Sequence, residues 1–234
     1  MGTMKSFIVI LVISTVLLAA NFTDDFDSYT PGSNLSSSPY WFSSDSSGSL
    51  IIAEDGSNRI AQTVWNGNKF VGYVCMGAGV WADGTIGCDV KFTGSQAAFA
   101  LMSRINGFSS ESYIAGMFAM IPPVGSTFIA YVDSTGGYNI LAQDYFYPLN
   151  EDTWYSLNLE ISGSDSVDIS LSVNNSVNSH FVFTEYVLPA GLSGVAAGFD
   201  STHVPLFSID NFEVTDNIQS FTTTTFGGIK AIFR

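Results

Sequence analysis

The strongest constraint on the fold is a strict alternation of apolar and polar residues near the middle of the chain. Leu157, Leu159 and Ile161 are separated by single polar residues, a period of two that is typical of a strand with one buried face. Similar short segments recur along residues 49–214, roughly ten residues apart, with Gly, Ser, Asn and Asp between them. No segment holds a helical period. The spacing is typical of an all-β sandwich or barrel.

The composition supports this interpretation. Hydrophobic residues make up 46% of the 234 residues, enough for a sizeable core, and only 12% are charged, against a typical ~25%. Gln96–Ile105 and Tyr113–Ile121 are nearly continuous apolar runs, which predict central strands. No linker precedes residue 216. We therefore predict one domain over residues 21–216, an all-β, two-sheet antiparallel β-sandwich of the jelly-roll type.

The N-terminus has the order of a secretory signal peptide. Lys5 precedes the apolar run Phe7–Leu18, and Ala19 and Ala20 precede a polar segment. The run is shorter than the ~20 residues that a membrane-spanning helix needs. We predict removal of residues 1–20 and a secreted or cell-surface protein with no membrane insertion after cleavage. The alternative is an uncleaved anchor.

Residues 217–234 form a separate, threonine-rich tail. Thr222–Thr225 is a run of threonines, and the apolar terminus Ile229–Arg234 is too short to span a membrane. Three interpretations stay open: a strand docked on the domain, a strand donated to a neighbouring subunit, or a disordered end. Donation to a neighbour would allow self-assembly through Ile229–Arg234.

The charge of the chain excludes one class of partner. The formal net charge is −14, and between residues 21 and 216 the basic residues are only Arg59, Lys69, Lys91 and Arg104. Such a surface offers no basic patch to a phosphate backbone, so nucleic acid is not an expected partner. It is compatible with neutral glycans or cations.

The chain has two cysteines, Cys75 and Cys88. In an exported protein we expect a disulfide between neighbouring strands, with two buried thiols as the alternative. Without a second cysteine pair or a histidine cluster, a zinc site is not expected.

Three short motifs resemble a known superfamily. They are the segment from Phe22 to Tyr29, the Thr-Trp-Tyr that starts at Thr153, and the closing segment Phe207–Val214. Together they resemble the concanavalin A-like lectin/glucanase superfamily, and the laminin-G-like domains most. The resemblance implies that the first and last strands lie side by side, with Phe26 near Phe212. It also implies a glycan site on the concave sheet.

The enzymatic branches of this superfamily are a weaker match. The resembling glucanases carry Glu-x-Asp-x-Glu on one strand, and this spacing is absent here. The pairs Glu54–Asp55 and Glu151–Asp152 are adjacent residues in turns, so their side chains diverge. Neither of the two histidines, His180 and His203, lies in a family-like motif. Hydrolysis of this type is therefore disfavoured, although enzymes that place their acids elsewhere stay open.

The resemblance also implies a calcium site on the convex face. Ca²⁺ takes six to eight oxygen ligands, many of them backbone carbonyls. Asp27 (or Asp25), Gly48 and Asp210 match the expected positions. The alternative is that Asp210 and Asn211 form a polar bulge without a metal.

Aromatic faces are the groups that bind sugar rings, helped by a few polar side chains. The candidates are Trp81, Trp65, Tyr73 and Tyr113, with Arg104 as the polar partner. Trp81 is the strongest, because it lies in a glycine-rich loop; the alternative for each is a place in the core. A second aromatic group lies in the serine-rich loop at Tyr40, Trp41 and Phe42. It either pins that loop to the sandwich or contacts a ligand.

The sequence as a whole predicts a secreted, non-catalytic carbohydrate-binding or adhesion module. Two alternatives stay open. One is a polysaccharide-acting enzyme, a glycoside hydrolase or lyase, of the same fold. The other is a structural surface or particle protein that assembles through its C-terminal tail.

Overall fold

The computed structural model describes residues 21–43, 50–64, 70–93, 98–108, 114–121, 126–132, 138–145, 149–184, 189–198 and 206–216. Their secondary structure is almost entirely strand, with one short 3₁₀ helix, η1 (Leu35–Ser37). The strands are β1 (Asn21–Asp24), β2 (Trp41–Ser43), β3 (Leu50–Asp55), β4 (Asn58–Thr63), β5 (Phe70–Cys75), β6 (Gly84–Thr93), β7 (Ala98–Phe108), β8 (Ile114–Ile121), β9 (Ser126–Val132), β10 (Tyr138–Tyr145), β11 (Trp154–Ser162), β12 (Val167–Val173), β13 (Ser176–Phe183), β14 (Leu192–Gly198) and β15 (Leu206–Asp216). In this part of the chain no helix is long and apolar enough to cross a membrane.

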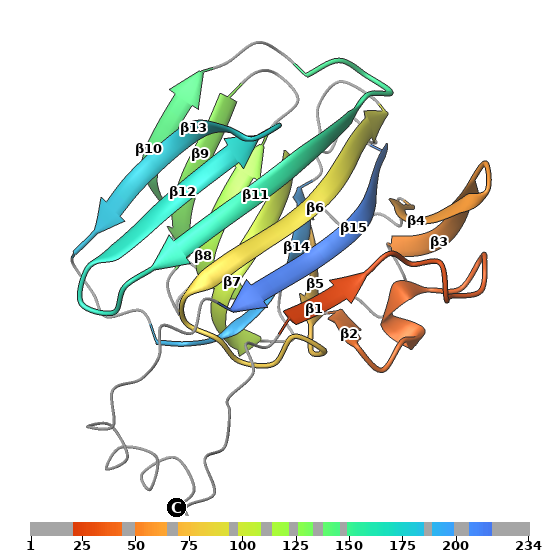
Figure 1. Ribbon diagram of the computed structural model, residues 1–234, viewed down its shortest axis with the longest axis horizontal. Helices are drawn as coiled ribbons and strands as arrows, with labels where there is room; N and C mark the ends of the chain where they lie inside the picture. Colours follow the sequence, from red (N-terminus) through yellow and green to blue (C-terminus); the bar gives the residue numbers. More distant parts are fainter. Residues whose placement is uncertain are drawn as a thin grey trace, which may run out of the picture.

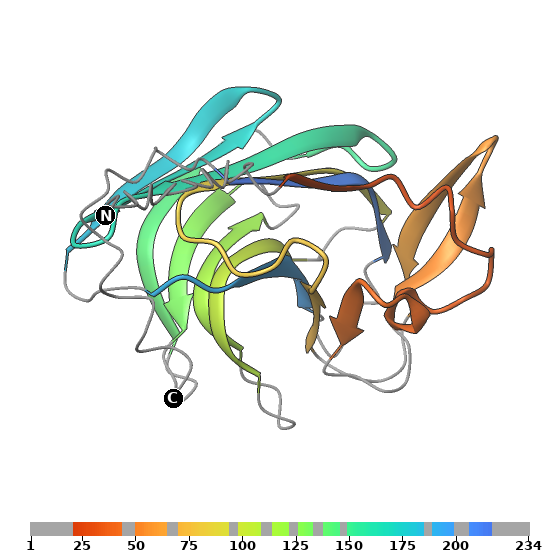
Figure 2. The same cartoon turned by 60° about the horizontal axis from the view of Figure 1, so that its bottom comes forward.

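The strands form two antiparallel sheets that pack face to face (Figures 1 and 2). Sheet A has the order β13-β12-β11-β6-β15-β4-β3, and β1 pairs with β15. Sheet B has the order β10-β9-β8-β7-β14-β5-β2. Sheet B is bent, with its concave side turned away from sheet A (Figure 2). The structure confirms the predicted two-sheet antiparallel sandwich.

The core lies between the sheets and follows the alternation in the sequence. Leu157, Leu159 and Ile161 of β11 are fully buried, whereas Glu160 between them is exposed. The same core cluster includes residues of sheet B, among them Phe99, Leu101 and Val195. Burial of each large aliphatic side chain stabilises the fold by about 1.5–3 kcal/mol. The alternation therefore assigns each face of the strand correctly.

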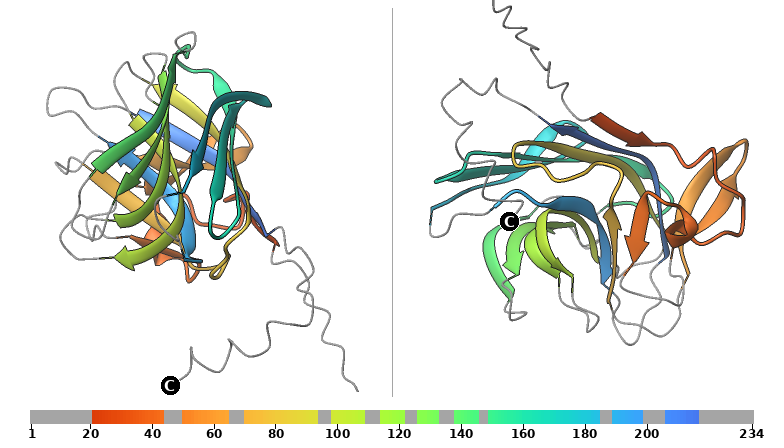
Figure 3. Two further views of the ribbon diagram at one scale, coloured as in Figure 1. Left: turned by 90° about the vertical axis from the view of Figure 1, so that its left-hand side faces the viewer. Right: turned by 90° about the horizontal axis from the view of Figure 1, so that it is seen from below.

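The first and last strands lie side by side, as predicted. Phe22 of β1 is paired with Val214 of β15, and Asp24 with Phe212. β1 is short, because the chain leaves the strand after Asp24. The next residues form a turn closed by a hydrogen bond from the Tyr29 N–H to the Phe26 carbonyl oxygen at 3.1 Å. The view from below in Figure 3 shows β1 beside β15, near the β3–β4 hairpin.

The predicted disulfide is wrong: Cys75 and Cys88 are free, buried thiols. Cys75 ends β5 in sheet B, and Cys88 lies in β6 of sheet A. The chain crosses between the sheets after Cys75, so the two strands are not neighbours, and each thiol is packed in the core. Burial raises the pKa of the Cys75 thiol to about 11 and that of Cys88 well above its usual range.

We expect neither thiol of the native protein to react with a thiol reagent at pH 8, and both to react after unfolding. Because both pKa values are raised, the stability that these thiols contribute is present below the unfolded pKa of ~8.5 and is lost as pH rises through the folded values. The measurement is the time course of labelling with and without denaturant. Rapid labelling of native protein would contradict the burial.

Candidate functional site

A cavity lies at the edge of the sandwich, where β1 meets β15. Its volume is about 620 Å³. This value is within the ~300–1,000 Å³ of small-molecule sites. We call it the edge pocket. It is lined by Phe22, Thr23, Asp24, Asp25, Ser28, Tyr29, Tyr40, Asn211, Phe212 and Glu213.

The Asp24 carboxylate organises the floor of the edge pocket. Its Oδ1 accepts a hydrogen bond from the Phe26 N–H at 3.0 Å. Its Oδ2 accepts from the Tyr29 hydroxyl at 2.6 Å and from Trp41 Nε1 at 2.8 Å. Asp24 is buried, and three donors satisfy its charge. One carboxylate thus holds the turn, a phenol and an indole in place.

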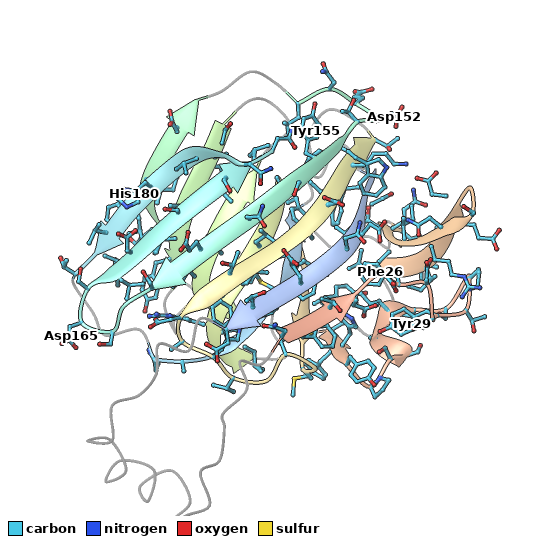
Figure 4. The ribbon with its side chains drawn as sticks, in the orientation of Figure 1. Phe26, Tyr29, Asp152, Tyr155, Asp165 and His180 are labelled. Carbon is cyan, nitrogen blue, oxygen red and sulfur yellow. The ribbon has the colours of Figure 1, made fainter. Side chains whose placement is uncertain are left out.

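The turn after β1 needs this support. Phe26 has φ 59°, a left-handed conformation that is uncommon for an aromatic residue. Its ring is fully buried and lies 6.2 Å from both Trp41 and Tyr29, measured between ring centroids. Burial raises the pKa of Tyr29, and the hydrogen bond to Asp24 adds to that shift, so the phenol remains a donor. Figure 4 shows Phe26 and Tyr29 together at this end of the molecule.

Tyr40 provides the exposed aromatic surface of the edge pocket. It is 49% exposed. The centroid of its ring lies 5.9 Å from that of Phe22. Phe22 in turn packs over Gly77, where an added Cβ would lie 2.3 Å from the Phe22 ring. Because residue 77 is a glycine, the Phe22 ring can pack directly on the backbone there and lie beside the Tyr40 ring.

A β-bulge in β15 forms the other wall. The pairing of β15 with β6 shifts between Asp210 and Glu213, and Asn211 has φ 48°. The bulge turns the Phe212 ring into the core, 4.8 Å from Trp41. It leaves Asn211 and Glu213 on the exposed side, where they line the pocket. The predicted polar bulge at Asp210 and Asn211 is confirmed.

The predicted calcium residues Asp27 and Asp210 lie close together. Burial raises the pKa of the Asp210 carboxyl, and the charges of Asp89 and Asp27 add to that shift. Gly48, the third predicted ligand, lies outside the described residues. Among the described residues, no group of three His, Cys, Asp or Glu side chains that could hold a metal is found.

The oxygens of this corner already accept N–H groups from the chain. Asp210 Oδ2 accepts from Asn58 Nδ2 at 2.6 Å. The Arg59 guanidinium donates to the carbonyl oxygens of Asp27 and Tyr29. These oxygens thus suit the N–H groups of Arg59 and Asn58 better than a calcium ion, which needs six or more oxygen ligands. Calcium binding stays a prediction.

Three of the predicted glycan-binding residues, Trp81, Tyr73 and Arg104, are buried instead of exposed. Trp81 is 2% exposed and donates from Nε1 to Ser193 Oγ. Tyr73 is equally buried, and its hydroxyl accepts the Leu50 N–H at 2.8 Å. Neither ring offers a face to a sugar. Glycines around Trp81 allow the loop to fold inward, which is why its exposure was mispredicted.

Arg104 is also buried, with 1% of its surface exposed. It donates to the carbonyl oxygens of Ala82 at 2.9 Å and Gly163 at 2.7 Å, and its Nη2 lies 3.1 Å from Asp83 Oδ1. Burial lowers the pKa of the guanidinium, and Asp83 opposes that shift. Arg104 therefore ties loops together. The remaining two candidates, Trp65 and Tyr113, lie outside the described residues.

The described strands of sheet B carry few charged residues. One register row crosses the sheet at Phe42, Val74, Gly194, Met102, Phe118, Ala130 and Ile140. In the described strands of sheet B, Asp144 is the only acidic residue. It is paired with Thr127, whose hydroxyl bonds Ser179 of sheet A. These strands therefore lack the two facing carboxylates that glycosidases use.

His180 lies on the outer face of sheet A, away from the edge pocket (Figure 4). Its Nε2 is 2.8 Å from Asp168 Oδ1, and about half of each side chain is exposed. The pair is a surface contact between β12 and β13. The other histidine, His203, lies outside the described residues.

The sequence interpretation missed much of the edge pocket. Phe22, Asn211 and Glu213 were not predicted as site residues. Tyr40 was considered, in the aromatic group that either pins its loop or contacts a ligand. The structure shows the pinning role for Trp41, which is buried, whereas Tyr40 is exposed and lines the pocket.

No protein-family model and no curated protein matches the chain. Solved structures do. The carbohydrate recognition domain of Emp46p, in its potassium-bound form, is 13% identical with a TM-score of 0.57, covering 85% of this chain and 96% of that one. The carbohydrate-binding module CBM66 from Bacillus subtilis is 16% identical with a TM-score of 0.50, covering 76% and 92%. The Bacillus licheniformis β-glucanase is 12% identical with a TM-score of 0.53, covering 84% and 98%.

These structures have the concanavalin A-like jelly-roll fold, and the predicted resemblance is confirmed at the level of fold. They include carbohydrate-binding domains and a β-glucanase, so the likeness shows the fold and does not separate binding from catalysis.

Proposed function

We propose that this concanavalin A-like chain is a non-catalytic carbohydrate-binding protein that holds its sugar in the edge pocket. The observation that carries the proposal is the composition of that pocket. The exposed Tyr40 ring lies beside polar groups of Asp25, Ser28 and Asn211 in a cavity of about 620 Å³. A tyrosine face packs against the apolar face of a sugar, and the polar groups bind its hydroxyls.

The non-catalytic part of the proposal rests on where the carboxylates lie. A glycosidase places two carboxyl groups about 5–9.5 Å apart across the bond that it cuts. The described strands of sheet B supply no such pair on their concave face. In the edge pocket, Asp24 is committed to three donors of its own chain. The other two carboxylates of the pocket, Asp25 and Glu213, are exposed, and we expect them to accept hydrogen bonds from sugar hydroxyls; release of reducing ends from a bound oligosaccharide would instead assign them to catalysis.

Replacement of Tyr40 tests the proposal. We expect Tyr40→Ala to weaken glycan binding at least tenfold, because aromatic anchors at binding sites are worth about 2 kcal/mol or more. Phe42→Ala is the matched control: Phe42 is 51% exposed, in the same loop region, but does not line the pocket. Binding is measured by a glycan array and then by calorimetry, with and without a chelator.

Each outcome has a separate meaning. Loss of binding in Tyr40→Ala alone supports the edge pocket. Equal loss in both variants, or in Phe42→Ala only, places the site on sheet B. Loss of binding on chelation would support the predicted calcium. If the protein binds no glycan on the array, the proposed function is rejected.

The predicted signal peptide would place this binding outside the cell or at its surface. β1 begins at Asn21, the residue that follows the proposed cleavage site. Self-assembly through Ile229–Arg234 is a separate proposal, because that segment lies outside the described residues.

A further inference from the structure

The charged side chains that line the edge pocket are all acidic. The carboxylates of Asp24, Asp25 and Glu213 line it, and no Lys, Arg or His is among the described lining residues. Both oxygens of Asp24 accept hydrogen bonds from its own chain. Asp25 and Glu213 are exposed and line the pocket. A carboxylate is only an acceptor, so Asp25 and Glu213 suit hydroxyl donors.

The described cations near this end are engaged elsewhere. Arg59 donates to the carbonyl oxygens of Asp27 and Tyr29, and to neither exposed carboxylate of the pocket in any described contact. Lys91 lies 2.7 Å from Asp55 Oδ2 and over the Trp154 ring. A negative charge on a ligand would therefore meet two carboxylates without a basic partner.

We propose that the edge pocket selects glycans without negative charge: neutral hexose or N-acetylhexosamine units, and not uronate, sialylated, sulfated or phosphorylated ones. This inference rests on the proposed function and adds the class of ligand. Sugar hydroxyls donate to Asp25 and Glu213, and the apolar face of the ring lies on Tyr40. An anionic group in the same place is repelled, and the repulsion weakens its binding roughly tenfold or more at low salt.

The test compares oligosaccharides that differ only in charge. Neutral gluco-, galacto-, manno- and N-acetylglucosamine oligomers are titrated into the full mature chain. The hexose oligomers are then titrated again after oxidation of the primary hydroxyls to carboxylates. We expect at least one neutral oligomer to bind and its oxidised form to bind tenfold or more weakly. Because both carboxylates are exposed, the difference shrinks at high salt.

Variants identify the cause of the selection. The double replacement of Asp25→Asn and Glu213→Gln keeps the size of both side chains and removes both charges. The affinity of the unmodified protein for the oxidised ligand is expected to be lower than for the neutral one. We expect the double variant to reduce this ratio of affinities at least threefold. Asp168→Asn, on the outer face of sheet A, is the matched control and leaves the difference unchanged.

The outcomes separate the two proposals. If no oligomer binds, the proposed function is rejected. If a neutral oligomer binds and its oxidised form binds equally well or better, the glycan-binding function stands and the charge selection is wrong. The selection by Asp25 and Glu213 is also overturned if the double variant discriminates as strongly as the unmodified protein.

Discussion

Asp24→Ala is expected to lower the free energy of unfolding by about 3–4 kcal/mol and to abolish binding at the edge pocket. The change removes the only described acceptor for the Tyr29 hydroxyl and for Trp41 Nε1, and also that of the Phe26 N–H. A buried donor left without a partner costs about 1–3 kcal/mol, and losses within one network are not additive. The left-handed Phe26 then loses the hydrogen bond that supports it.

Chemical denaturation measures this effect, and Asp25→Ala is the matched control. Asp25 is the adjacent residue and is exposed; its Oδ1 accepts one N–H, from Asp27. We expect this control to change stability by less than about 1 kcal/mol. Similar losses in both variants would show that Asp24 does not organise the floor of the pocket.

Arg104→Ala is expected to lower the free energy of unfolding by about 3–5 kcal/mol. The guanidinium is almost completely buried and joins three segments through Ala82, Asp83 and Gly163. Its removal leaves the Ala82 and Gly163 carbonyl oxygens without this donor and breaks the ion pair with Asp83, which keeps one hydrogen bond, from the Gly163 N–H. Gly191 packs directly on the Arg104 backbone, where an added Cβ would lie 2.4 Å from the carbonyl carbon, so the site has little room to relax.

Lys91→Ala is the control for this second prediction, because Lys91 also lies in an ion pair on a strand. Lys91 is 19% exposed, against 1% for Arg104, while the two carboxylates are about equally exposed. Exposed pairs contribute about 0–1 kcal/mol, so a small change is expected. If Arg104→Ala were as mild as Lys91→Ala, Arg104 would not be structural, and its predicted role at a ligand site would deserve a new test.

The positions of the central strands along the chain and their buried faces were predictable because they depend on local patterns. The alternation at Leu157, Leu159 and Ile161 is independent of the partner strand, since successive side chains point to opposite faces of any strand. The turn residues between strands act over four residues or fewer. The closing segment Phe207–Val214 was recognisable for the same reason, although its bulge was predicted only as an alternative.

The site was less predictable, because exposure of an aromatic side chain depends on contacts between distant segments. Trp81 and Tyr40 both lie in polar or glycine-rich loops, yet Trp81 is buried against Ser193 and Tyr40 is exposed beside Phe22. Sequence alone does not distinguish them. The same limit explains the wrong disulfide, since Cys75 and Cys88 are close in the sequence but lie in different sheets.

The sequence by itself determined the all-β class, the two-sheet sandwich and the faces of its central strands, because period-two alternation and turn chemistry are short-range properties. Only the tertiary structure decided where a ligand fits. The edge pocket exists because β1, the Tyr40 loop and the β15 bulge meet at one corner. That meeting depends on pairing between the two ends of the domain, which no local pattern encodes.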